Sequence, residues 1–152
     1  MEWVQDDGGR AAAGYRGITG DCVVRSIAIA TEKPYQEVYD ALFEAQRELG
    51  ESGRCRKARR VASRGASPRS GVFDKVYRPY LERLGWRWVP TMQIGQGCKV
   101  HLRAAELPSG RLIVRVSKHM VAVIDGIIHD AYDPSRGGTR CVYGYFTAPG
   151  AA

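Results

Sequence analysis

A β-hairpin signal in the segment SKHMVAVIDGIIHDAYDP, residues 117–134, constrains the fold of this chain more than any other feature. Two runs of apolar and β-branched residues are separated there by Asp125-Gly126, a pair that favours the backbone of a two-residue hairpin turn. Pairing outward from that turn sets Ile124 against Ile127 and Ala122 against His129. The segment therefore predicts two antiparallel strands with a defined register.

This register decides which side chains share a face of the hairpin. His119, Asp130 and Tyr132 fall on one face, with Asp130 diagonal to His119, whereas His129 falls on the other face. A carboxylate at position 130 can hold one ring nitrogen of His119 and leave the other nitrogen free. Asp133 follows the end of the second strand, where alternation no longer applies, so it stays a rival partner for His119. A longer turn would exchange the two faces.

The remaining sequence places helices before strands. Apolar residues at helical spacing predict helices at residues 23–30, 33–50 and 72–84. From Gly85 onward the pattern changes to short β-branched and aromatic runs broken by turn residues, which is typical of strands. This order predicts an α+β fold, with N-terminal helices followed by a mostly antiparallel sheet. We expect a single domain over residues 1–152, with residues 1–20 as an extended lead-in.

The first predicted helix begins with a cysteine, in the segment TGDCVVRSIAIA. Thr19, Gly20 and Asp21 are residues that cap helix N-termini, so Cys22 should lie in the first turn. The N-terminal end of a helix dipole stabilises a thiolate there. Most lone cysteines are small buried apolar residues, so the assignment of Cys22 depends on acid–base partners elsewhere in the chain.

The other cysteines indicate no disulfide framework and no metal site. Four cysteines are widely spaced without a C-x-x-C pair, and the acidic N-terminus lacks a secretion signal, so we expect reduced thiols in a cytoplasmic protein. Cys98 and His101 form a C-x-x-H with no second ligand pair, and we expect neither a metal nor another cofactor. No apolar run reaches the roughly 18 residues that a membrane span needs.

The positive charge of the chain is concentrated in residues 51–71. Seven Lys and Arg residues stand there against a single Glu, while the rest of the chain is nearly neutral. Val61 is the only large aliphatic residue of the segment, which predicts a mobile excursion with at most one helical turn. A solvated loop is one interpretation. The other is a contact with nucleic acid or an acidic protein, through Arg54, Arg56, Lys57, Arg59 and Arg60.

A thiolate-favouring cysteine, then a histidine and then an acid are what a cysteine acyl-transfer site requires. The chain carries these residues in that order. The segment GDCVVRSIAIAT resembles the nucleophile helix of the papain-like cysteine peptidase superfamily. KHMVAVIDGIIHDAYDP resembles the His–Asp hairpin of its bacteriocin-leader-peptidase branch and of small bacterial and phage relatives. The correspondence extends over residues 17–146. It implies Cys22 as nucleophile, His119 as general base and acid, and Asp130 as orienter. The implied activity is hydrolysis of a peptide, isopeptide or related amide bond through a thioester.

One part of the papain-like pattern is missing. Papain-like peptidases carry a Gln a few residues before the Cys as an oxyanion donor, but residues 15–21 read YRGITGD, and Gln5 is distant. The backbone N–H of Cys22 and the side chain of Thr19 would have to serve instead. Losing one oxyanion donor costs about 10²–10³ in rate. The alternative is therefore a catalytically weak or inactive papain-like binding module whose basic segment contacts nucleic acid or an acidic protein.

Overall fold

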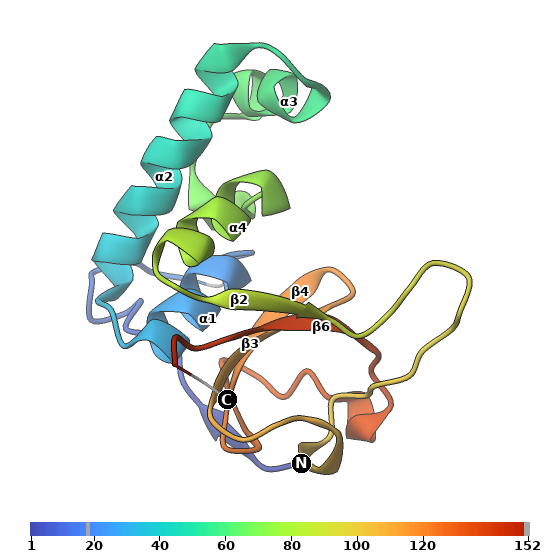
Figure 1. Ribbon diagram of the computed structural model, residues 1–152. Coiled ribbons are helices and arrows are strands. Elements are labelled where there is room, and N and C mark those ends of the chain that lie inside the picture. Colours follow the sequence, from blue (N-terminus) through green and yellow to red (C-terminus); the bar gives the residue numbers. More distant parts are fainter. Residues whose placement is uncertain (18, 151–152) are drawn as a thin grey trace.

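The computed structural model of the chain describes residues 1–17 and 19–150. Within these residues the helices are α1 (Cys22–Thr31), α2 (Tyr35–Ser52), α3 (Arg56–Arg64) and α4 (Asp74–Arg83). The strands are β1 (Trp3–Gln5), β2 (Arg87–Pro90), β3 (Arg111–Val116), β4 (His119–Ile124), β5 (Ile127–Asp130) and β6 (Val142–Thr147). All four helices precede five of the six strands (Figure 1), which confirms the predicted α+β organisation.

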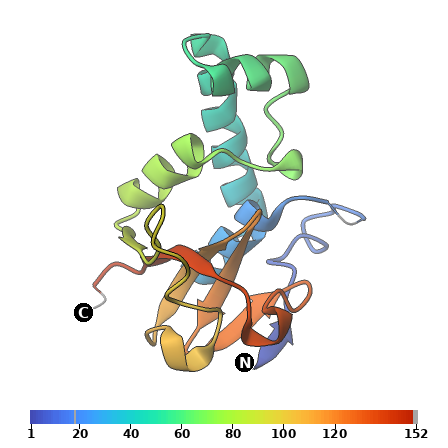
Figure 2. The ribbon, with the colours of Figure 1, turned by 90° about the vertical axis from the view of Figure 1, so that its right-hand side faces the viewer.

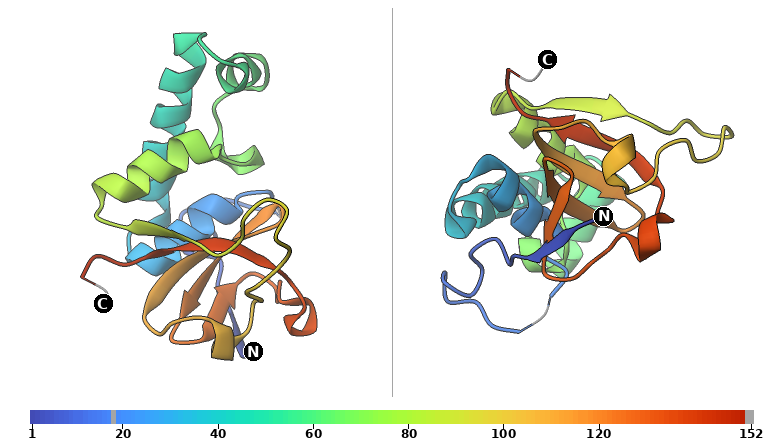
Figure 3. Two further views of the ribbon diagram at one scale, coloured as in Figure 1. Left: turned by 45° about the vertical axis from the view of Figure 1, so that its right-hand side comes forward. Right: turned by 90° about the horizontal axis from the view of Figure 1, so that it is seen from below.

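The six strands form one sheet in the order β1-β5-β4-β3-β6-β2, seen from two further sides in Figure 3. Only the pair β1–β5 is parallel, so the sheet is mostly antiparallel. The hairpin β4–β5 has the predicted register, with Ala122 opposite His129 and Ile124 opposite Ile127. Asp125 and Gly126 both have positive φ (49° and 78°), as a tight two-residue hairpin turn requires.

Helix α1 carries apolar side chains on nearly all sides, and nearly all of them are buried by neighbouring elements. Val24 and Ile27 pack against Ile113, Met120 and Ala122 on one face of the sheet. Helix α4 also reaches the sheet, where the ring of Tyr77 contacts that of Phe146 in β6, and α3 is the element farthest from the sheet (Figures 1 and 2). The opposite face of the sheet forms a second apolar cluster beneath the irregular segment that precedes β3.

The basic segment 51–71 is more regular than its composition predicts. Nine of its residues form α3, whose Ala58 and Val61 are buried. The buried Gln46 of α2 donates a hydrogen bond to the carbonyl of Ala66 (3.0 Å) and so fixes the chain after α3. The expectation of one helical turn in this segment is therefore wrong, because Ala58 and Val61, at i and i+3, suffice to pack a short helix onto α2.

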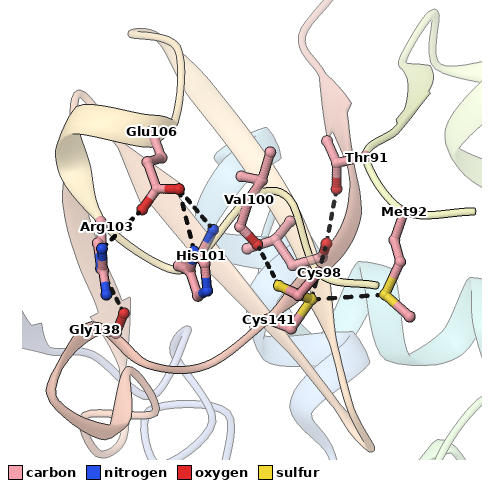
Figure 4. Close-up of a disulfide and its surroundings, with 10 residues drawn as sticks. Thr91, Met92, Cys98, Val100, His101, Arg103, Glu106, Gly138 and Cys141 are labelled. Carbon is pink, nitrogen blue, oxygen red and sulfur yellow. Dashed lines mark hydrogen bonds and ion pairs between the residues drawn. A yellow bond between two sulfur atoms is a disulfide. The ribbon is translucent and has the colours of Figure 1, made fainter. Parts of the chain in front are cut away.

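Two of the four cysteines form a disulfide, Cys98–Cys141, shown in Figure 4. The expectation of four reduced thiols is wrong for this pair, because the fold brings together positions 43 residues apart to a Cα–Cα distance of 5.8 Å. Cys22 and Cys55 are free. The C-x-x-H residues have other partners, since the sulfur of Cys98 is in the disulfide and Nδ1 of His101 lies 3.2 Å from a carboxylate oxygen of Glu106.

Residues 1–17 are a short strand followed by loops. Strand β1 adds to the sheet edge parallel to β5, and the indole N–H of Trp3 donates to the backbone carbonyl of Asp130 (3.1 Å). The extended lead-in thus continues the sheet next to the predicted His–Asp hairpin. No helix within residues 1–17 and 19–150 is long and apolar enough to cross a membrane.

Candidate active site

Three element ends bring Cys22, His119 and Asp130 together. Cys22 is the first residue of α1, His119 is the first of β4, and Asp130 is the last of β5. Nε2 of His119 lies 2.6 Å from a carboxylate oxygen of Asp130, and both side chains are buried. The Cys22 thiol lies near enough to the His119 ring for the imidazole to lower the pKa of the thiol, and both residues line the same cleft. The three residues that the sequence singled out therefore form one contiguous constellation.

The electrostatics of this constellation favour a thiolate beside an imidazolium. Burial raises the pKa of the Cys22 thiol, but His119, the backbone N–H of Met120 and the Arg25 guanidinium outweigh burial and hold that pKa below its usual value. Burial lowers the pKa of His119, whereas the hydrogen bond to Asp130 and the neighbouring Cys22 raise it, and the net direction is upward. Both shifts favour transfer of the thiol proton to the ring.

A buried ionic network continues from Asp130 into the N-terminal part of the chain. The guanidinium of Arg25 lies 3.3 Å from Asp130 and also pairs with Asp21. Asp21 is fully buried and accepts further hydrogen bonds from Arg10 (3.3 Å) and from the hydroxyl of Tyr35 (2.6 Å). The two arginines and the two carboxylates alternate along this network, so their formal charges cancel. The ion pair with Arg25 helps to hold the Asp130 side chain in place. An arginine within an otherwise apolar helix was the sequence signal for this network.

The start of α1 differs from the prediction at Asp21. Its carboxylate makes no capping hydrogen bond to the helix, because it is committed to the arginines and the tyrosine. Sequence reasoning placed the helix start correctly and assigned Asp21 the wrong role. Thr19 lines the same cleft as Cys22, and its buried hydroxyl has no hydrogen-bond partner among the described residues. Thr19 and Cys22, which the sequence predicts as the oxyanion donors, thus both line this cleft.

Tyr132 is a residue of the site to which the sequence assigned no role, although it was placed on the His119 face of the hairpin. Its hydroxyl lies 3.2 Å from Nδ1 of His119, and the two ring centroids are 5.2 Å apart. Because Nε2–H donates to Asp130, Nδ1 of the neutral ring is an acceptor and the tyrosine hydroxyl donates to it. Tyr132 therefore competes with Cys22 for the nitrogen that would exchange the catalytic proton.

The rival partners of His119 lie elsewhere. Asp133 is exposed, and its carboxylate accepts a hydrogen bond from the backbone N–H of Ser135 (2.9 Å), which is a turn-stabilising contact. His129 faces the other side of the hairpin, with Nδ1 3.8 Å from a carboxylate oxygen of Asp6. Among the three acidic or basic candidates in the hairpin, Asp130 is the one that contacts His119.

The constellation opens onto a cleft of about 690 Å³. Cys22, His119 and Tyr132 form one wall, and the chain around Phe73 together with the first turns of α4 forms another. Trp88 also lines the cleft, so both apolar and polar surface lies within reach of the thiol. A cleft of this size accommodates several residues of an extended peptide.

Comparisons of this chain with protein-family models, with curated proteins and with solved structures gave no match. The assignment of the site therefore depends on its own geometry: a thiol at a helix N-terminus, an imidazole and a buried carboxylate in sequence, beside a cleft.

Proposed function

We propose that this protein is a small papain-like cysteine hydrolase that cleaves a peptide, isopeptide or related amide bond. The observation that carries the proposal is the constellation of Cys22, His119 and Asp130, of which Cys22 and His119 line a substrate-sized cleft. The order of elements supports the papain-like assignment, because the thiol begins a helix packed on an antiparallel sheet whose later strands supply the histidine and then the acid.

In the proposed reaction, His119 takes the thiol proton on Nδ1 while Nε2–H stays bonded to Asp130. The Cys22 thiolate attacks the carbonyl carbon, and the carbonyl electron pair moves to oxygen to give a tetrahedral intermediate. Collapse of this intermediate breaks the C–N bond, and the imidazolium transfers its proton to the leaving amine. A water molecule then attacks the thioester, His119 takes its proton, and the thiolate leaves as the carboxylic acid is released.

The oxyanion of both tetrahedral intermediates would be stabilised by the backbone N–H of Cys22 and the hydroxyl of Thr19. The support for Thr19 is its unpartnered hydroxyl, within the described part of the chain, beside the thiol. This pair would replace the Gln side chain of the papain-like pattern, whose place before Cys22 is taken by residues without an amide side chain. Removal of the Thr19 hydroxyl should then lower the hydrolysis rate about 10²–10³-fold.

The test of the proposal uses the full chain and its Cys22→Ala and His119→Ala variants. A fluorescent iodoacetamide should label wild-type protein rapidly at Cys22 near neutral pH, and His119→Ala should slow this labelling. A mixture of peptides bearing a fluorogenic C-terminal amide should release fluorophore with wild-type protein only. If Cys22 is unreactive, or if its labelling does not depend on His119, the proposal is wrong.

The second candidate is a catalytically inactive binding module that uses the cations of the basic segment 51–71 to contact nucleic acid or an acidic protein. Its support is that Arg54, Arg56, Arg59 and Arg60 are exposed and make no ion pair with the described residues. A Cys22→Ala variant that binds nucleic acid with salt-dependent affinity, together with an unreactive Cys22 in the wild-type protein, would favour this candidate. The cytoplasmic location inferred from the sequence stays a prediction for both candidates.

A further inference from the structure

Three cations of α3 surround one aromatic ring that lines the cleft. Lys57, Arg60 and Arg64 place their charged groups 5.9, 5.8 and 4.8 Å from the ring centroid of Phe73. The three residues share one face of the helix because Ala58 and Val61 turn the adjacent face towards α2. We call Lys57, Arg60, Arg64 and Phe73 the cation cluster.

The charge of the cation cluster is only partly neutralised. Lys57 pairs with Asp74, whereas Arg60 and Arg64 make no ion pair with any described residue. The first turn of α3 contains no acidic residue either. Gathering like charges around one ring raises their mutual repulsion, and cation–π contacts at an exposed site offset only part of it. An anion bound at the cluster would relieve this repulsion.

The cation cluster is continuous with the cleft that contains the thiol. Phe73 and Asp74 line the cleft, and so does Arg78, one turn further along α4. Arg115 and Lys118, close to His119 in the sequence, also line the cleft, and among the described lining residues Asp74 is the only acidic one. Positive charge therefore extends along the cleft from α3 to the candidate catalytic residues.

We propose that the cation cluster is a substrate-binding subsite, and that the substrate of Cys22 carries a run of Asp or Glu residues which binds there. The inference rests on the proposed function, because it assigns the acidic run to the same peptide whose amide bond lies at the thiol. Arginine pairs with carboxylate through two parallel N–H···O bonds. Arg60 and Arg64 are exposed and make no ion pair with a described residue, and Arg64 donates one N–H to the carbonyl of Gly71 (3.5 Å). Three cations lie within 5.9 Å of the Phe73 ring centroid, so the charge gathered at the ring favours carboxylates over the stacking of a nucleic-acid base.

The experiment measures binding without catalysis, in the Cys22→Ala full-length protein. Fluorescence anisotropy at low salt compares a labelled octaglutamate peptide with an octaglutamine peptide of the same length. Arg60→Glu/Arg64→Glu should weaken octaglutamate binding at least about tenfold, equivalent to about 1.4 kcal/mol. The matched control is Arg56→Glu/Arg59→Glu, which makes the same charge change on exposed residues of α3 that do not contact Phe73, and it should weaken binding less than about threefold.

Equal weakening by both double variants would overturn the proposal, because the charge of α3 as a whole would then be responsible. Equal binding of octaglutamine, or tighter binding of a single-stranded oligonucleotide through Arg60 and Arg64, would overturn it as well. Circular dichroism of each variant establishes that it is folded, and Lys57→Gln provides a milder change that should reduce affinity in the same direction. An unreactive Cys22 in wild-type protein would refute the proposed hydrolase without changing the binding result, so the two failures are distinguishable.

Discussion

Replacing Asp130 with Asn should slow the reaction of Cys22 with iodoacetamide about 10- to 150-fold near neutral pH. The hydrogen bond between Nε2 of His119 and the Asp130 carboxylate is 2.6 Å long, and the two side chains are only 5% and 3% exposed. A buried hydrogen bond to a charged group contributes about 1.5–3 kcal/mol, and this free energy stabilises the imidazolium beside the thiolate. Asn keeps an oxygen acceptor at the same place, so the change removes mainly charge.

The sign of the pH effect follows from the two pKa directions. The Asp130 carboxylate helps to raise the pKa of His119, so in Asp130→Asn the ring loses its proton at a lower pH. The positive charge that holds down the pKa of Cys22 is then lost, and the thiol pKa rises. The inflection of the alkylation rate should therefore move to higher pH in the variant.

The assay is mass-spectrometric measurement of Cys22 alkylation across pH, with circular dichroism and thermal melting to establish folding. Asp133→Asn and His129→Asn are the matched controls, and each should change the rate less than about twofold, since Asp133 contacts a turn N–H and His129 faces away. A large loss in Asp133→Asn with an unchanged rate in Asp130→Asn would refute the assignment of the orienter.

Three further predictions concern the same site. Cys22 should be alkylated before Cys55, because a buried imidazolium as well as a helix N-terminus stabilises its thiolate, and peptide mapping at early times would reveal the opposite order. Arg25→Met should lower the free energy of unfolding by about 3–5 kcal/mol in urea titrations, because two buried carboxylates lose their shared cation; a loss below about 1 kcal/mol would contradict this. Tyr132→Phe should speed Cys22 alkylation about 2- to 10-fold, since the tyrosine hydroxyl stabilises the neutral form of His119. A slower rate in this variant would mean that the hydroxyl stabilises the imidazolium instead.

Local signals in the sequence were sufficient for the elements that carry the candidate site. The Asp125-Gly126 turn and the alternation of the flanking strands predicted the register of β4 and β5, and that register is confirmed. The helix start at Cys22 was also predicted, although the reason given for it, capping by Asp21, is wrong. Such signals work because turn geometry and side-chain alternation depend on residues within a few positions of one another.

Predictions from composition were wrong where the packing of a few residues determined the structure. The basic segment lacks large aliphatic residues, yet Ala58 and Val61 pack onto α2 and the segment forms a helix. Similarly, no spacing rule connects Cys98 with Cys141, because the strand arrangement brings them together across 43 residues. Contacts of this kind depend on the distance between elements in space, which the pattern of either segment does not contain.

By itself, the sequence determined which residues could act as nucleophile, base and acid, and in which register the two strands of the hairpin pair. Only the tertiary structure decided that the thiol meets the imidazole. Helix α1 packs on the sheet face that carries Met120 and Ala122, whereas alternation turns His119 towards the other face with Val121. The two groups still meet, because Cys22 and His119 are both terminal residues of their elements and these ends lie together at one end of the sheet. That meeting depends on how α1 is placed along the sheet, which the packing of its apolar side chains sets and no local pattern encodes.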